Sequence, residues 1–265
     1  MQRYVVRRIL VAVPTLVGAT LLVFLLLRVL PGDVAKMVLF GRGGEGAFSA
    51  RNYEQLRREL GLDRPLAVQF VTWYGDVFRG SFGNSLWNGR PVGREILHRL
   101  PLTLEIAVLA QLIAIPLGLA IGTVSAIRQD TWLDYLLRVW SILFLATPSF
   151  WLGLLVLLVG VSLFRWMPPI GYYSLWEDPW NNLRQLIWPA LILASHEMAR
   201  VARLVRSSML EVMREDYIRT ARAKGITELM VIQRHALKNA LLPAVTLVAI
   251  SFGHQLGGAV VLERV

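Results

Sequence analysis

The sequence has no cysteine and none of the residue patterns that build a common catalytic centre. Without cysteine, the chain cannot form disulfides, use a thiol nucleophile or ligate a metal through sulfur. It also contains no G-x-x-x-x-G-K-[ST] run, so it does not bind ATP through a P-loop. Neither H-E-x-x-H, nor a Ser/His/Asp set, nor a carboxylate pair occurs at a useful spacing. We therefore expect no enzyme activity, no resident cofactor and no metal ion in this chain.

Charged residues are also scarce, at 17% of the chain, whereas hydrophobic residues make up 55% and the mean hydropathy is +0.51. A helix needs about 20 mostly apolar residues to cross a bilayer, and several windows of the sequence reach that length. The sequence thus predicts an all-α, polytopic membrane protein. Its five expected spans lie at about residues 9–29, 102–126, 136–163, 186–205 and 240–262.

The formal net charge is +10. In a membrane protein, Lys and Arg gather beside the spans, where they fix orientation and meet anionic lipid. We therefore expect membrane lipid, and no nucleic acid, as the partner of this charge. Arg3, Arg7 and Arg8 precede the first span, whose apolar run is too long for a signal peptide and is not followed by a cleavage site. The N-terminus is predicted to be cytoplasmic and the first span to be uncleaved.

Three regions are predicted along the chain. Residues 1–30 form the N-terminal span, and residues 31–100 form an extracytoplasmic segment with amphipathic helices, one of them beginning at Leu66. Residues 101–265 hold the remaining spans and a cytoplasmic segment, 207–238. The connection between the fourth and fifth spans is rich in cations: Arg206, Arg214, Arg219, Arg222, Lys224, Arg234 and Lys238.

Within that connection, Asp216-Tyr-Ile-Arg-Thr-Ala-Arg-Ala-Lys-Gly225 is typical of a short helix followed by a turn. Glycine tolerates positive φ, so Gly225 is expected to join two helices. Ala221 and Ala223 are expected to keep one surface small enough for a partner to approach closely. Nearby Arg and Lys side chains would offer positive charge to an acidic surface of that partner. Spacing alone leaves open the alternative of a basic loop that only sets topology.

This run, followed by Arg234-His-Ala-Leu-Lys-Asn-Ala-Leu-Leu-Pro243, resembles the EAA loop of permease subunits in binding-protein-dependent ABC importers. The residues of this motif are similar to those of the dipeptide, oligopeptide and nickel branch of that family. Thr147-Pro-Ser-Phe-Trp-Leu-Gly153 and Leu204-Val-Arg-Ser-Ser-Met-Leu210 agree with the branch, and the resemblance runs in order along the chain. The generic motif begins Glu-Ala-Ala where this chain has Arg219, Thr220 and Ala221, a departure that the same branch shares.

The resemblance implies a type I ABC importer permease fold in the bacterial or archaeal cytoplasmic (inner) membrane. It implies a second homologous permease subunit, two cytoplasmic ATPase subunits that bind ATP and magnesium, and an extracytoplasmic substrate-binding protein. It also implies a sixth span, so we expect the chain to be truncated at its C-terminus. The implied ATPase-docking residues are Asp216, Tyr217, Arg219, Thr220, Ala221, Arg222, Ala223, Lys224 and Gly225.

Peptides are the expected substrate from this resemblance. The same architecture serves the import of nickel, glutathione or another small solute, and this alternative stays open. An ATP-independent secondary transporter is less expected, because inverted repeats or discontinuous helices with ion-site carboxylates are not evident in the sequence.

Polar residues inside spans are costly in lipid and usually face a pathway or another helix. The candidates for the translocation path between two permease subunits are Glu105, His196, Glu197, His254 and Gln255. Hydrogen bonding between helices is the alternative for each of them. Side chains at adjacent positions diverge by about 100° on a helix, so residues 196 and 197 are not expected to share a metal ion.

Overall fold

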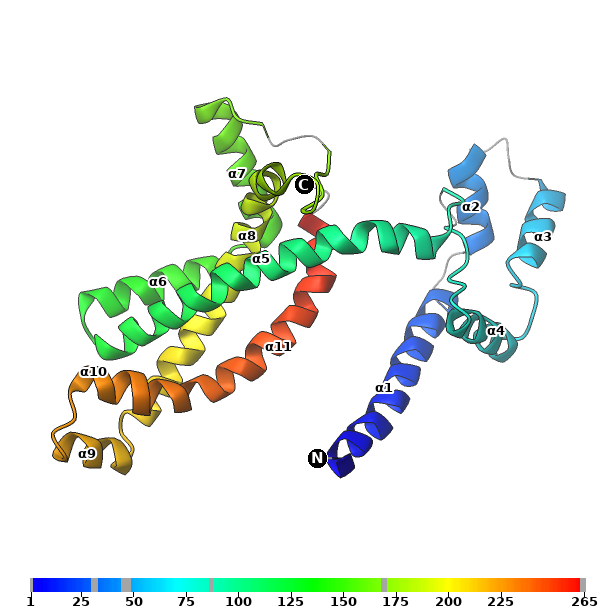
Figure 1. Cartoon of the computed structure of the whole chain (residues 1–265). Helices are drawn as coiled ribbons and strands as arrows, with labels where there is room; N and C mark the ends of the chain where they lie inside the picture. The colour runs from blue at the N-terminus through cyan, green and yellow to red at the C-terminus, as the bar shows by residue number, and fades with distance from the viewer. Residues whose placement is uncertain (1, 30–32, 44–48, 86–87, 168–170, 263–265) are drawn as a thin grey trace. The chain divides into compact units, whose positions relative to one another are not determined.

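The computed structural model describes the whole chain except residues 1, 30–32, 44–48, 86–87, 168–170 and 263–265 (Figure 1). In the described part, helices dominate, and the β-structure consists of an isolated antiparallel bridge between Asn84 and Pro91. The predicted all-α fold is confirmed. The chain divides into two compact units, Met1–His98 and Arg99–Val265.

The first unit contains the helices α1 (Gln2–Val29), α2 (Val34–Gly43), α3 (Ala50–Glu59) and α4 (Leu66–Phe78). Its α1 is long and apolar enough to cross a membrane, and most of its side chains are exposed. The amphipathic helix predicted from Leu66 is present as α4. Its aromatic rings cover Phe24 of α1, which is 7% exposed, with Phe70 at 5.3 Å and Trp73 at 6.2 Å between ring centroids.

The second unit is a helical bundle. It contains most of α5 (Val92–Ile127), then α6 (Trp132–Ala146), α7 (Ser149–Phe164), α8 (Pro179–Val212), α9 (Asp216–Ala223) and α10 (Glu228–Met230). A π-helical turn, η2 (Val231–Ala236), then leads into α11 (Leu237–Leu262). Figure 1 shows α9 and α10 together at one end of this unit, beside the far end of α8.

Small residues let α5 and α8 pack with their backbones close together. Four buried positions spaced four residues apart form the small-residue face of α5: Ala110, Ala114, Gly118 and Gly122. Opposite them, α8 contributes Ala190, Ala194 and Ala202, which are at most 3% exposed. A Cβ added at Gly122 would lie 2.5 Å from the carbonyl oxygen of Ala202. Such close approach is typical of helix pairs in membranes, where small side chains drive packing.

The structure corrects the predicted third span, 136–163. Instead of one helix, it contains α6 and α7, which are bent by 100° at Thr147 and Pro148. Proline has no backbone N–H and disfavours a helical conformation in the residue before it, so α6 ends here and α7 begins with Pro148 as its N-cap. The sequence alone leaves open whether Pro148 bends a helix or marks a helix start. Pro116 and Pro189, in contrast, lie inside α5 and α8 without ending them.

Length and composition identify three single helices in the described residues as able to span a membrane: Gln2–Arg28, Val92–Ile127 and Glu228–Leu256. The bent pair α6–α7 makes a fourth if it is taken as one span. The predicted fourth span, 186–205, lies within α8, but this helix carries several charged residues and is not among them. Composition does not identify it as a span, so this span stays a prediction.

Candidate functional site

The segment after α8 forms the helix–glycine–helix element that the sequence predicts. After α9, Lys224 ends the helix and Gly225 adopts φ +76°, which confirms the expected turn. The N–H of Gly225 donates to the carbonyl of Arg222 at 2.9 Å, and the N–H of Ile226 donates to that of Ala221 at 3.3 Å. These two bonds form a Schellman motif, in which glycine is the favoured residue at the left-handed position.

One face of α9 is buried against the end of the bundle. Ile218 is fully buried and Ala221 is 7% exposed, and both belong to a hydrophobic cluster with Met209 of α8 and Val231 of η2. This placement corrects the expectation for Ala221, whose small side chain serves packing within the chain and not the approach of a partner. Ala223, by contrast, is exposed.

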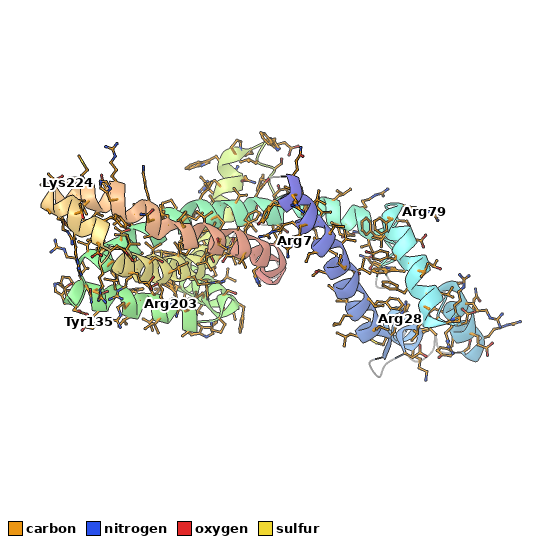
Figure 2. The ribbon with its side chains drawn as sticks, turned by 90° about the horizontal axis from the view of Figure 1, so that it is seen from below. Arg7, Arg28, Arg79, Tyr135, Arg203 and Lys224 are labelled. Atoms are coloured by element: carbon orange, nitrogen blue, oxygen red, sulfur yellow. The ribbon has the colours of Figure 1, made fainter. Side chains whose placement is uncertain are left out.

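The opposite face of the element carries charge, much of it already paired within the chain. Arg222 donates to both carboxylate oxygens of Glu228, at 3.0 and 2.7 Å, and therefore fastens α9 to α10. Arg219 lies 3.3 Å from Asp216 in an exposed pair, the kind that contributes little to stability. Lys224 is exposed and projects from the end of the unit in Figure 2.

Further contacts hold α9 in place and extend its exposed surface. The side-chain amide of Asn239 in α11 donates to the hydroxyl of Tyr217 at 2.7 Å, and the Thr220 hydroxyl donates to the Asp216 carbonyl at 2.9 Å. Leu229 and Met230 of α10 are 65% and 48% exposed. Sequence reasoning missed these two apolar residues, although their place directly after the helix start at Thr227 was a usable signal.

Of the predicted path residues, Glu105 lies near the N-terminal end of α8. Its two carboxylate oxygens accept hydrogen bonds from the Asn182 amide at 2.7 Å and from the Tyr172 hydroxyl at 2.9 Å. Partial burial and this bond to Glu105 raise the pKa of Tyr172, in the loop between α7 and α8, to about 12. Glu105 therefore joins α5 to α8 and to the preceding loop.

His196 lies beside the break between α6 and α7. Its Nε2 is 2.6 Å from the carbonyl oxygen of Thr147, an arrangement in which Nε2–H donates to the carbonyl. A helix end leaves carbonyl groups without an intrahelical partner, and a side chain from another helix can satisfy them. His196 thus supports the discontinuity, which is the interhelical role that the sequence left open.

Glu197 is fully buried between α8 and α11. Its carboxylate lies 3.7 Å from Nε of Arg200. The buried hydroxyl of Ser251 in α11 faces the same carboxylate. In the same bundle, Gln255 of α11 accepts a hydrogen bond of 3.3 Å from Gln111 of α5. His254 is exposed.

The five predicted path residues have different surroundings. Glu105 and His196 bind other parts of the chain, Glu197 and Gln255 are buried, and His254 is exposed but close enough to interact with Glu197. Their role in a translocation path stays a prediction. Among the described residues, no group of three or more acidic, histidine or cysteine side chains has the arrangement of a metal site.

An ion-pair network that sequence reasoning missed joins α6 to α8. The fully buried carboxylate of Asp134 accepts hydrogen bonds from Nε and Nη2 of Arg206, at 2.8 and 2.7 Å. It also accepts bonds from the Ser125 hydroxyl and, at 3.1 Å, from the Asp130 backbone N–H. Because all of these groups are fixed by Asp134, the α5–α6 hairpin is tied to the part of α8 that leads into α9.

Comparison with known proteins gives matches along nearly the whole chain. Residues 1–107 match the family described as the N-terminal part of binding-protein-dependent transport system membrane components. Residues 114–265 match the family described as binding-protein-dependent transport system inner membrane component.

Several relatives are similar over the full length of this chain. A Brucella suis protein, provisionally named a peptide transport system permease protein, is 39% identical over 265 residues, which are 100% of this chain and 83% of that protein. The oligopeptide transport system permease protein of Bacillus subtilis is 36% identical over 268 residues, with 100% and 83% covered. The glutathione transport system permease protein of Salmonella paratyphi A is 37% identical over 265 residues, with 100% and 82% covered.

Proposed function

The chain belongs to the family of binding-protein-dependent transport system inner membrane components, and we propose that it forms the translocation path for di- and oligopeptides in an ATP-driven importer. Two of the relatives are named peptide or oligopeptide transport permeases, and this supports peptides as the substrate. The chain is a multi-pass permease subunit of the inner membrane. In this proposal, separate subunits supply the energy for transport. Two ATPase subunits would bind ATP and magnesium.

The exposed face of α9 and α10 is the observation that supports docking of ATPase subunits to this chain. It combines an exposed cation, Lys224, with the exposed apolar side chains of Leu229 and Met230, on an element whose other face is anchored in the bundle core. A partner that pushed on this surface would move the end of α8 directly, because Ile218 packs in one cluster with Met209. A basic loop that only set topology would not need such an anchor.

In the proposed mechanism, closure of the ATPase subunits displaces α9, and the bundle changes between inward-facing and outward-facing states. The path would lie between this chain and a second, homologous permease subunit. The N-terminus would be cytoplasmic, as would α9. Residues 31–100 would lie outside, where they would help to dock the substrate-binding protein that delivers the peptide. Glu105, near the N-terminal end of α8, would then belong to the outer half of the path.

The second candidate is an importer of the same architecture for glutathione. The relative from Salmonella paratyphi A carries that substrate in its name at 37% identity, which is similar to the identity of the peptide permeases. Glutathione is itself a small peptide derivative, so both substrates would need a pathway for a zwitterionic, extended molecule. A binding assay on the partner substrate-binding protein distinguishes them.

The docking assignment is tested by co-purifying the complete chain with the products of neighbouring genes. We expect a second permease and ATPase subunits to remain bound to the wild type. Gly225→Val should lose the ATPases and keep the second permease, because a β-branched residue at φ +76° strains the turn. Gly225→Asn is the matched control, since asparagine tolerates this conformation. Equal ATPase recovery with the two variants would contradict the assignment of this surface.

A further inference from the structure

A cavity of about 290 Å³ lies between α5, α6 and α8 in the second unit, and the proposed function does not use it. One part of its wall is polar and strongly basic, formed by Arg138 of α6 and by Arg203 and Arg206 of α8, with Ser125, Ser141 and Ser207 among them. The remainder is apolar, with Ile121 of α5 and Leu137, Ile142 and Leu145 of α6. The cavity wall is therefore basic in one part and apolar in another.

The arginines in this wall have unequal partners. Arg206 is bound through two nitrogens to Asp134, and the Asp134 carboxylate is already saturated by Ser125 and a backbone N–H. Arg138 lies at the limit of an ion pair with Asp134, at 4.0 Å, and its guanidinium lies over the ring of Tyr135, 5.5 Å from the centroid. Within the described part of the chain, no carboxylate lies within ion-pair distance of Arg203. The cavity wall thus contains three guanidinium groups and one buried carboxylate. Because each arginine has five N–H donors, positive charge and hydrogen-bond donors are in excess there.

The position of the cavity indicates the source of a matching anion. It opens beside the outward face of α6, where Val139 and Ile142 are 54% and 58% exposed, as side chains that meet acyl chains would be. Two of its arginines, Arg203 and Arg206, lie in the last turns of α8 before the segment that leads into α9. If that segment is cytoplasmic, as the proposed function holds, the cavity faces the cytoplasmic leaflet, where anionic lipids are found and basic pockets between helices bind their headgroups.

We propose that this cavity binds the phosphate group of an acidic phospholipid, with Arg138 and Arg203 donating to the phosphate oxygens. Arg206 is held in place by Asp134, which also balances its charge, and forms the rest of the polar wall. The first carbons of an acyl chain lie along Ile142 and Leu145. In Figure 2, Arg203 lies on the opposite side of the unit from Lys224, so this site is separate from the proposed ATPase-docking surface.

The test measures lipid binding by the complete permease, co-purified with its partner subunits and freed of lipid by detergent exchange. Phosphatidylglycerol and phosphatidylcholine are added separately, and the bound lipid is counted by native mass spectrometry. A charge at a membrane surface changes lipid affinity by about fivefold, so Arg138→Gln combined with Arg203→Gln should weaken phosphatidylglycerol binding by roughly 25-fold. Arg128→Gln is the matched control, because Arg128 lies in the same α5–α6 hairpin but does not line the cavity.

Selective retention of phosphatidylglycerol, lost in the double variant and kept in Arg128→Gln, is the expected result. Equal retention by the double variant and the wild type would overturn the proposal. Inorganic phosphate is titrated in a separate arm in phosphatidylcholine, with thermal stability as the readout. Stabilisation by free phosphate through the same arginines, without any preference for phosphatidylglycerol, would also overturn the lipid as occupant. Loss of the second permease subunit in the double variant would instead assign this surface to a subunit interface. The lipid assays compare the double variant with Arg128→Gln, and neither change lies on the proposed ATPase-docking surface. The lipid result can therefore be interpreted even if the ATPase-docking assignment fails.

Discussion

Adding a single methyl group to α5 at Gly122 should separate α5 from α8 and destabilise the bundle. A Cβ at this position would lie 2.5 Å from the Ala202 carbonyl oxygen and 2.9 Å from Cβ of Val205. The first of these is a backbone atom and the second belongs to a β-branched side chain, so neither can turn away. Overpacking of a core costs about 1–3 kcal/mol, and contact with backbone places Gly122→Ala at the upper end of that range.

Gly118→Ala should cost less and should be rescued. Its new Cβ would lie 2.8 Å from Cβ of Val201 and 3.0 Å from the Met198 carbonyl oxygen. Val201→Gly removes both Val201 atoms that the new Cβ would meet, Cβ and Cγ1, so the double variant Gly118→Ala/Val201→Gly should be less destabilised than the two single changes added together. Gly122→Ala has no equivalent rescue, because its nearest neighbour is a carbonyl oxygen of the main chain.

The assay is thermal unfolding of the purified chain in detergent, followed by circular dichroism and by loss of monodisperse protein. Gly253→Ala in α11 is the matched control, because a Cβ there would meet no atom within 4 Å. Alanine favours a helix over glycine by about 1 kcal/mol, so the control should be as stable as the wild type or more stable. If Gly122→Ala unfolds at the same temperature as Gly253→Ala, the close packing of α5 on α8 is refuted.

Three further predictions follow from other contacts. Asp134→Asn should destabilise the chain by about 3–5 kcal/mol in thermal unfolding, because it leaves the Arg206 guanidinium without its buried carboxylate; an unchanged midpoint would contradict this. His196→Leu should cost about 1–3 kcal/mol by leaving the Thr147 carbonyl unsatisfied, and His196→Gln, which keeps a donor, should cost less. Tyr172→Phe should remove an absorbance component of tyrosinate that titrates near pH 12. Because the raised pKa favours the neutral phenol, its contribution to stability is complete below pH 10 and is lost as the pH rises toward 12; variant and wild-type stabilities that converge at neutral pH would contradict it.

The helical elements could be read from the sequence wherever an apolar run determined them. α1, α5 and α11 include three of the predicted spans, because some 20 apolar residues admit few alternatives in a membrane. The turn at Gly225 was equally readable, since its chemistry is local to a few residues. The break at Pro148 was not, because proline is compatible with both a kinked helix and a helix start.

The candidate site was less readable, because its contacts join distant parts of the chain. Arg206 and Asp134 are 72 residues apart, and no local sequence pattern indicates that they form an ion pair. Ala221 was assigned to the partner surface although it is buried, since a short helix gives little indication of which face its own bundle covers. The intramembrane polar residues were identified by type, but their separate positions depend on how the helices pack.

The contact of α5 with α8 limits which joints of this protein can move during a transport cycle. Two helices whose main-chain atoms nearly touch cannot rotate or slide past one another without a collision, and the Asp134–Arg206 pair adds α6 to them. These three helices therefore count as one moving part. A gate in this chain must therefore open by moving other helices against this three-helix unit, and a cross-link between α5 and α8 would leave the transport cycle intact.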